Sequence, residues 1–220
     1  MCIRDSRNLS YLVSQAFVDG FYIKPRIDLD LLRRHSEGLI GLSACLAGEI
    51  PRRLVNGDYD GAKEYALTMQ DILGEGNFYL ELQDHGIPQQ ITVNRGLLRL
   101  HQETGIPLVC TNDAHYLRKE DAESHDVLLC IQTGKTVDDE NRMRYEPQNF
   151  YIRSTEEMEE LFAGYPDAVE NTQRIADRCR FDFTFGKYHL PEFQLPEGYD
   201  SPTYLRELCQ RGFRARYGEN

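Results

Sequence analysis

The chain has 220 residues with an ordinary globular composition, of which 40% are hydrophobic and 28% are charged. Its formal net charge of −11 argues against a duplex-binding surface over the whole chain, because phosphate contacts need clustered Lys and Arg. A chain of this length can bury one good core, or one domain and the beginning of another. No stretch approaches the ~18 uninterrupted apolar residues of a membrane span, so we expect no membrane partner.

The six cysteines are scattered without Cys-x-x-Cys spacing, and most stand in apolar helix or strand contexts. This pattern indicates reduced thiols and a cytoplasmic location. Residues 1–6 (MCIRDS) resemble the in-frame translation of a sequencing-library adapter, so we exclude them from fold reasoning. We therefore expect Met1 not to be a native start, and the chain to be a fragment that begins within a longer gene.

The first third of the chain predicts two helices and a strand. Apolar residues recur at helical spacing over residues 9–18, and residues 28–34 fit a short second helix. The apolar run at residues 38–43 is typical of a short buried parallel strand. Cys45 would then stand just beyond the end of that strand.

The middle of the chain repeats this order of helix and strand twice. Asp58 predicts the N-cap of a helix that Gly74 ends, and the strand at residues 78–82 leads to His85. Pro88 opens a helix that runs to Thr104. The apolar strand at residues 106–110 follows and leads directly to Asp113 and His115.

After His115 the pattern becomes mainly helical. Residues 121–131 predict an amphipathic helix, and residues 149–152 a short strand. Ser154 to Glu157 form a capping box for a further helix, and Pro166 opens another. On the helix after Pro166, the predicted apolar face comprises Val169, Thr172, Ile175, Ala176 and Cys179. The irregular stretch from Phe181 to Pro202 predicts a domain edge before a last helix that Gly218 ends.

Each of the three predicted strand-and-helix units places a possible metal ligand just beyond its strand. These residues are Cys45, His85, and the pair Asp113 and His115. In a β/α barrel, positions at the carboxyl ends of strands converge on the face where active sites are built. Imidazole, carboxylate and thiolate together suit zinc or another transition ion.

Each of these residues also has a simpler interpretation. Cys45 alone would pack as a small buried residue, and His85 would be a turn residue. Asp113 could cap the following turn through its side chain. His35, His101 and His125 stand in or beside helices, so we interpret them as surface or satisfied core residues.

Three stretches resemble successive motifs of the polymerase-and-histidinol-phosphatase (PHP) domain: GLSACLAGE at 41–49, YLELQDHG at 79–86 and TNDAHY at 111–116. They are most similar to the version that opens the alpha subunits of bacterial DNA polymerase III. Residues 121–135 and 188–193 extend the similarity, which covers the chain from about residue 8 to its end.

The resemblance implies an α/β fold, a partial irregular β/α barrel followed by a mainly helical C-terminal segment. We assign residues 7–185 to the carboxyl-terminal part of the PHP domain, and residues 186–220 to a connector and the start of the polymerase palm. By motif matching, Cys45, His85, Asp113 and His115 would hold a cluster of divalent zinc, manganese or iron. No catalytic residue apart from these ligands is implied. The implied reaction is 3′-5′ exonuclease cleavage, in which metals activate water and hold the phosphodiester.

The chain departs from the family pattern because it has no His-x-His pair, which the family carries in a preceding segment with other ligands. We therefore expect an incomplete cluster here. The palm carboxylates and their Mg²⁺ site would also lie outside the chain. Through its parent protein, the expected partners are a DNA primer-template, dNTPs, the sliding clamp and a proofreading exonuclease subunit.

Two other functions fit the same residues. One is a free-standing PHP phosphoesterase of the histidinol-phosphatase type, which would have no need of the segment from Tyr188 to Asn220. The other is a non-catalytic PHP platform that stabilises the polymerase or docks a proofreading subunit. The presence of all four expected ligands favours a metal-binding role over a purely structural one.

Overall fold

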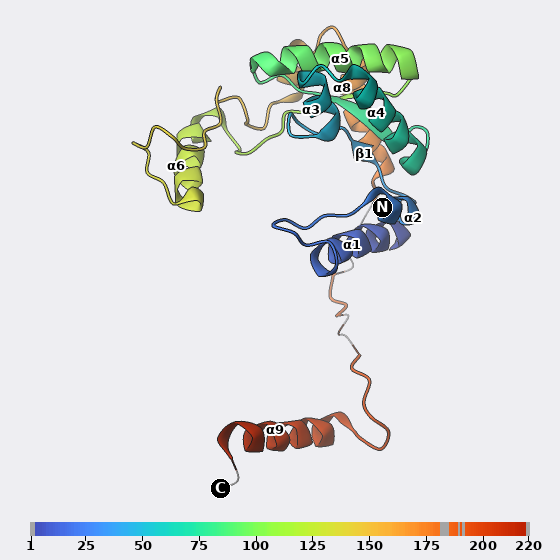
Figure 1. The fold of residues 1–220 in the computed structure, drawn as a ribbon, viewed down its shortest axis with the longest axis vertical. Coiled ribbons are helices and arrows are strands. Elements are labelled where there is room, and N and C mark those ends of the chain that lie inside the picture. Colours follow the sequence, from blue (N-terminus) through green and yellow to red (C-terminus); the bar gives the residue numbers. More distant parts are fainter. Residues whose placement is uncertain (1–2, 181–184, 189, 191, 219–220) are drawn as a thin grey trace. The chain divides into compact units, whose positions relative to one another are not determined.

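The computed structural model describes residues 3–180, 185–188, 190 and 192–218. The chain divides into two units, Met1–Phe181 and Asp182–Asn220 (Figure 1). The boundary expected between residues 185 and 186 stays a prediction, and residues 181–184 beside it lie outside the described part. The start of the first helix falls within residues 1–6, of which residues 1–2 are also outside it.

The described part of the first unit contains three short strands among a larger number of helices, and that of the second contains one long helix. The first unit comprises α1 Ile3–Val18, α2 Leu29–Arg34, β1 Gly41–Leu42, α3 Glu49–Val55, α4 Tyr59–Leu73, β2 Phe78–Leu82, α5 Pro88–Thr104, β3 Leu108–Cys110, the 3-10 helix η1 Lys119–Asp121, α6 Ala122–Thr133, α7 Thr155–Leu161 and α8 Pro166–Arg178. The second contains α9 Ser201–Tyr217. None of the helices in these described ranges is long and apolar enough to cross a membrane.

The three strands form a parallel sheet in the order β1-β2-β3. Gly41 of β1 pairs with Phe78 of β2, and Leu82 at the end of β2 pairs with Cys110 at the end of β3. The prediction of an α/β fold is therefore confirmed. Because the strands are parallel and in chain order, their carboxyl ends lie at one edge of the sheet, where the candidate ligands follow.

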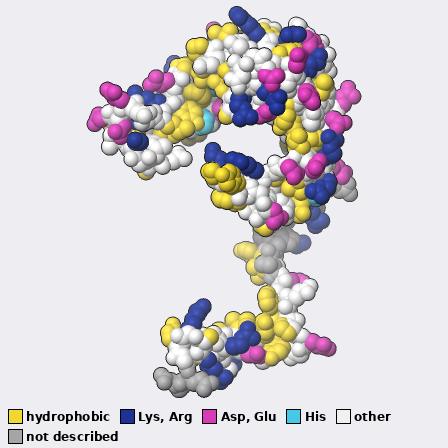
Figure 2. All heavy atoms as spheres, viewed as in Figure 1, with side chains coloured by type: hydrophobic (Ala, Val, Ile, Leu, Met, Phe, Trp, Pro, Cys, Tyr) yellow, Lys and Arg dark blue, Asp and Glu magenta, His cyan; other side chains and the backbone are white. Residues whose placement is uncertain are grey.

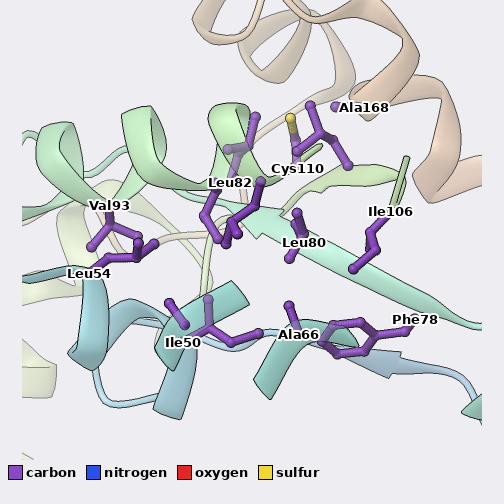
Figure 3. Close-up of a cluster of buried hydrophobic side chains, with 14 of the residues drawn as sticks. Ile50, Leu54, Ala66, Phe78, Leu80, Leu82, Val93, Ile106, Cys110 and Ala168 are labelled. Atoms are coloured by element: carbon purple, nitrogen blue, oxygen red, sulfur yellow. The ribbon is translucent and has the colours of Figure 1, made fainter. Parts of the chain in front are cut away.

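The core surrounds β2, the central strand, which is apolar and buried except at Glu81. A strand that is covered on both faces reads as a nearly continuous apolar run, and β2 has this pattern. Helices α3 and α5 pack against each other, α5 also contacts β2, and α8 packs on β3. Figure 3 shows side chains from α3, α4, α5, β2 and β3 gathered in one cluster, including Leu80 and Leu82 of β2.

Local signals in the sequence set most helix ends where they were expected. The Asp58 side chain accepts a hydrogen bond from the Gly61 N–H at 3.0 Å, so it caps α4 as predicted. Gly105, with φ of 73°, ends α5 in the left-handed conformation that glycine adopts without strain. Ser154 and Glu157 form both bonds of the predicted capping box of α7.

Two elements differ from the predictions. Helix α3 was not predicted; it follows Gly48, which offers no side-chain cap, and it is stabilised by burial of Ile50 and Leu54. The strand expected at residues 149–152 is absent among the described residues and is replaced by a single bridge between Tyr116 and Tyr151. Hydrogen bonds from the His115 and Tyr116 N–H groups to Phe150 O, and from the Ile152 N–H to Leu117 O, hold this segment beside the turn after β3.

The apolar faces of two elements also differ. Strand β1 has only two residues, and Leu42 is exposed, so the predicted buried strand is shorter and more open than expected. Helix α8 buries Ala168 and Asn171. Of the predicted face, Val169 and Ile175 are half-buried, whereas Thr172, Ala176 and Cys179 are exposed. The buried Asn171 is satisfied there, because its side chain donates a hydrogen bond to the Leu108 carbonyl at 2.8 Å.

Acidic and basic side chains lie intermixed on the visible face of the molecule (Figure 2). One three-way cluster joins helices α4 and α5: Glu103 contacts Lys63 at 2.8 Å and Arg99 at 2.7 Å. These two cations lower the pKa of Glu103 from 4.5 to about 2, chiefly through hydrogen bonds from Lys63 and then Arg99. The ionised carboxylate is therefore favoured in the folded state.

This cluster predicts that the stability of the fold decreases over a defined range of acidic pH. A carboxylate whose pKa is lower in the folded state contributes stability above its unfolded pKa, and loses it as the pH falls towards the folded pKa. The contribution of Glu103 should therefore disappear between pH 4.5 and about 2. In urea unfolding across this range, Glu103→Gln should flatten the pH dependence of stability, whereas the exposed-site control Glu64→Gln should not. An unchanged pH profile in Glu103→Gln would contradict this account.

Candidate metal centre

The four predicted ligands follow the carboxyl ends of the three parallel strands. Cys45 comes after β1, His85 after β2, and Asp113 with His115 after β3. Because the strands are parallel, all four begin from the same edge of the sheet. Their side chains nevertheless differ in exposure and in partners.

Asp113 and His115 are brought together. Asp113 Oδ1 lies 3.6 Å from His115 Nε2, and each side chain is about one-third exposed (33% and 32%). Two ligands about 2.1 Å from a tetrahedral metal stand roughly 3.4 Å apart, so this spacing fits two donors to one ion. The pair is therefore open to solvent and spaced for shared coordination.

The backbone of this turn is held in an unusual conformation. Asp113 has φ of 41°, in the left-handed region that is costly for residues other than glycine. The neighbouring Asn112 side chain donates hydrogen bonds to the carbonyls of Asn149 (3.1 Å) and Tyr151 (2.6 Å), and the His115 N–H donates to Phe150 O at 2.7 Å. The segment at residues 149–151 thus fixes the direction of both candidate ligands.

His85 is almost completely buried, with 1% of its surface exposed, and both of its ring nitrogens have protein partners. The Gln90 amide donates to Nδ1 at 2.7 Å, so Nε2 carries the proton and donates to Asn112 O at 2.8 Å. Its ring stacks on Phe150 at 4.1 Å. His85 therefore supports the carbonyl next to Asp113, and it would have to break one hydrogen bond to bind a metal.

Cys45 is half-buried and follows Ala44, which has φ of 65°. Over the described ranges, no group of three or more His, Cys, Asp or Glu side chains is arranged to hold a metal ion. The structure thus brings together Asp113 and His115, but it does not join Cys45 or His85 to them in one ligand group. All five described cysteines are free thiols, as expected.

Glu81 is a structural member of this region that the sequence reasoning missed. Its carboxylate accepts hydrogen bonds from the Ala44 N–H (3.0 Å), the Gln83 amide (3.0 Å) and the Thr111 hydroxyl. It therefore connects the turn after β1, next to Cys45, with the end of β3, next to Asp113. The signal was present, since Glu81 is the single charged residue in the otherwise apolar β2.

This network predicts that two substitutions of Glu81 lower the unfolding free energy by different amounts. Glu81→Ala would leave the Ala44 N–H and the Thr111 hydroxyl without their acceptor, at an expected cost of about 1–3 kcal/mol in unfolding free energy. Glu81→Gln keeps one acceptor oxygen and should lose less. Urea unfolding with both variants measures the difference, and equal stability of Glu81→Ala and the unaltered chain would contradict the proposed connection.

Aromatic rings surround His115. Its ring centroid lies 4.4 Å from Tyr145, 5.7 Å from Phe150 and 5.8 Å from His125. Burial, followed by the neighbouring His115, lowers the pKa of His125. His125, which the sequence suggested was a surface or core residue, therefore lies beside the candidate site.

Comparison with known proteins gives the site a context. Residues 4–85 match the PHP domain family, so the matched range ends at His85 and does not include Asp113 or His115. DNA polymerase III subunit alpha of Borreliella burgdorferi is 45% identical over 213 residues, which is 96% of this chain and 18% of that protein. The same subunit of Treponema pallidum is 43% identical, and that of Thermus aquaticus 42% identical, each over 96% of this chain.

These matches extend well beyond the range of the PHP domain family. Since they cover 96% of the chain, they include the turn that carries Asp113 and His115. The chain spans about a fifth of the length of these curated relatives (18%). It carries part of a PHP domain and is homologous, over almost its whole length, to a segment of the DNA polymerase III alpha subunits.

Proposed function

We propose that this chain contributes part of the metal centre of a PHP phosphoesterase domain within a replicative DNA polymerase alpha subunit. The observation that carries the proposal is the solvent-open pair of Asp113 and His115, 3.6 Å apart, beyond the end of a parallel strand. The relatives in which this turn is aligned are named as polymerase alpha subunits.

The described residues alone are too few for a complete site. Structural zinc sites use four protein ligands and catalytic ones three, whereas the described residues bring together two of the four candidates, Asp113 and His115. We propose that parts of the full-length protein outside this chain supply further ligands. Within this chain Cys45 is the stronger candidate for another ligand, because His85 would have to give up one of its two ring hydrogen bonds to bind a metal. Zinc, manganese or iron would polarise the phosphodiester and activate water when bound.

The proposed reaction of the complete domain is 3′-5′ cleavage of a DNA strand. Polymerisation, with its primer-template, dNTPs and Mg²⁺, is proposed for other parts of the parent protein. The sliding clamp and a proofreading exonuclease subunit are proposed as its partners, and the cytoplasm as its location. A free-standing phosphatase is a weaker candidate, because the similarity to polymerase subunits includes almost the whole C-terminal segment.

A non-catalytic PHP platform is the second candidate. It is favoured by the engagement of both ring nitrogens of His85 and by the lack of a three-ligand group among the described residues. A platform would keep the fold and the subunit contacts without metal-dependent cleavage. The two candidates therefore differ in one measurable activity.

The test uses the full-length protein and a single-stranded oligonucleotide labelled at its 3′ end. With manganese or zinc, we expect release of the labelled nucleotide, which a chelator stops. Asp113→Ala should lower this rate by about 100-fold or more, because catalytic metals supply several kcal/mol of transition-state stabilisation. Primer extension by the same variant is the control for folding. Undiminished cleavage by the variant would refute the site, and a metal-loaded but inactive wild type would favour the platform.

A further inference from the structure

A polar pocket of about 120 Å³ lies next to the candidate metal pair. Helix α6 and the segment at residues 142–148 form most of it, and its lining includes Tyr116, His125, Arg142, Arg144, Tyr145 and Gln148. Two of these, Tyr145 and His125, are in ring contact with His115. The pocket is therefore a direct neighbour of the proposed reaction site.

Arg142 forms a fixed wall of this pocket. Only 4% of its side chain is exposed, and its guanidinium donates two hydrogen bonds, of 2.5 and 2.6 Å, to the Asp126 carboxylate. This bidentate pairing lowers the pKa of Asp126, and the charges of Arg142 and Asp126 compensate each other in the pocket lining. Arg142 Nε is buried and has no hydrogen-bond partner among the described residues. A buried N–H without an acceptor indicates that a water or ligand oxygen belongs nearby.

Arg144 is the more available cation of the pocket. Its ion pair with Glu146 is long, at 3.8 Å, and the side chains of Arg144 and Glu146 are 42% and 70% exposed. Exposed ion pairs of this kind are weak, so an anion in the pocket can replace Glu146 as partner. A guanidinium binds phosphate oxygens through two parallel hydrogen bonds, which a carboxylate at 3.8 Å does not form.

Neutral donors complete the lining. The Tyr116 hydroxyl oxygen accepts a hydrogen bond from the Phe150 N–H at 3.2 Å, which leaves its own proton free to donate. Gln148, whose side-chain amide has two N–H donors, also lines the pocket. The lining contains two acidic side chains. Asp126 is paired with Arg142, and Glu146 is mostly in solvent.

We propose that this pocket binds the phosphate group of a nucleotide, with Arg144 as the principal contact and Tyr116 and Gln148 as supporting donors. The ligand class is the terminal nucleotide of a DNA strand. The phosphodiester bond that joins it to the preceding nucleotide would lie at Asp113 and His115. Its place in a cleavage reaction rests on the proposed function. The binding itself needs no metal, so it is tested separately.

The test uses the 220-residue chain in the presence of EDTA, with dAMP and deoxyadenosine as probes in NMR or calorimetric titrations. We expect saturable binding of dAMP and none of deoxyadenosine, since the phosphate is the recognised group. Arg144→Gln should weaken dAMP binding by about tenfold or more, the effect of losing a charge-assisted hydrogen bond. Arg95→Gln, which removes an exposed arginine of α5, should bind as the unaltered chain does.

Arg142→Gln is less informative because it breaks a buried ion pair and is expected to destabilise the fold, so Arg144→Gln carries the test. Lack of saturable dAMP binding, or equal binding by Arg144→Gln, would overturn the proposal. Equal binding of deoxyadenosine would also overturn it, because the base would then be the recognised group. Phosphate binding in a protein whose Asp113→Ala variant retains full nuclease activity would support the pocket and refute only the proposed metal site.

Discussion

Replacement of Leu80 by alanine should lower the free energy of unfolding of the first unit by about 2–5 kcal/mol. Leu80 is fully buried in the middle of the central strand β2, within the cluster shared by α3, α4 and α5. The variant loses the transfer free energy of the side chain and leaves a cavity that a sheet covered on both faces closes poorly. Urea unfolding monitored by circular dichroism measures the effect.

A matched control for this prediction is Leu117→Ala. Leu117 is 68% exposed and lies beyond the sheet, so its loss should change stability by no more than about 0.5 kcal/mol. Similar losses at positions 80 and 117 would mean that β2 is not the centre of the core. The position of all candidate ligands depends on that strand, so the same experiment also tests the scaffold of the site.

The two histidines should respond to substitution in opposite ways. In the full-length protein, His115→Ala should lower metal affinity by about 100-fold or more, since even partners outside the ligand shell contribute 10–100-fold. Its effect on metal-free stability should be about 1 kcal/mol or less, because the side chain is partly exposed. Metal content after equilibrium dialysis and urea unfolding with a chelator measure the two quantities.

His85→Ala should show the reverse pattern. It removes a buried ring that stacks on Phe150 and bonds to both Gln90 and Asn112, so we expect a loss of about 2–4 kcal/mol without metal. Its effect on metal affinity should be the smaller of the two histidines. A loss of affinity equal to that of His115→Ala, with stability unchanged, would show that His85 is a ligand and that its ring turns on binding.

Much of the fold follows from local signals in the sequence. The caps at Asp58, Gly105 and Ser154 are short-range hydrogen-bonding patterns, so they set helix ends without knowledge of the tertiary structure. The apolar run of β2 likewise predicts a strand covered on both faces. Elements with strong local signals were therefore found close to their true positions.

The elements that were missed depend on long-range contacts. Helix α3 has no side-chain cap and forms because Ile50 and Leu54 pack against other helices. On the buried face of α8, the Asn171 side chain donates a hydrogen bond to the Leu108 carbonyl, 63 residues away in the sequence. Neither effect appears in a periodicity of apolar residues, so the pattern found the half-buried Val169 and Ile175 but missed Ala168 and Asn171.

The arrangement of the candidate site also depends on long-range contacts that the sequence pattern does not show. The order of strands placed the four candidate ligands at one edge of the sheet, but side-chain environment decided which of them meet. His85 points into a buried network with Gln90 and Asn112, while Asp113 and His115 face each other at the surface. Glu81 connects two of these turns, and its role became visible only through its partners.

The most direct test of the metal centre is anomalous diffraction from crystals of the full-length protein loaded with zinc or manganese. The account predicts an anomalous peak with an Asp113 carboxylate oxygen and a His115 imidazole nitrogen both within about 2.0–2.3 Å. A fully occupied, nuclease-active metal centre in which both side chains lie outside coordination distance would contradict it.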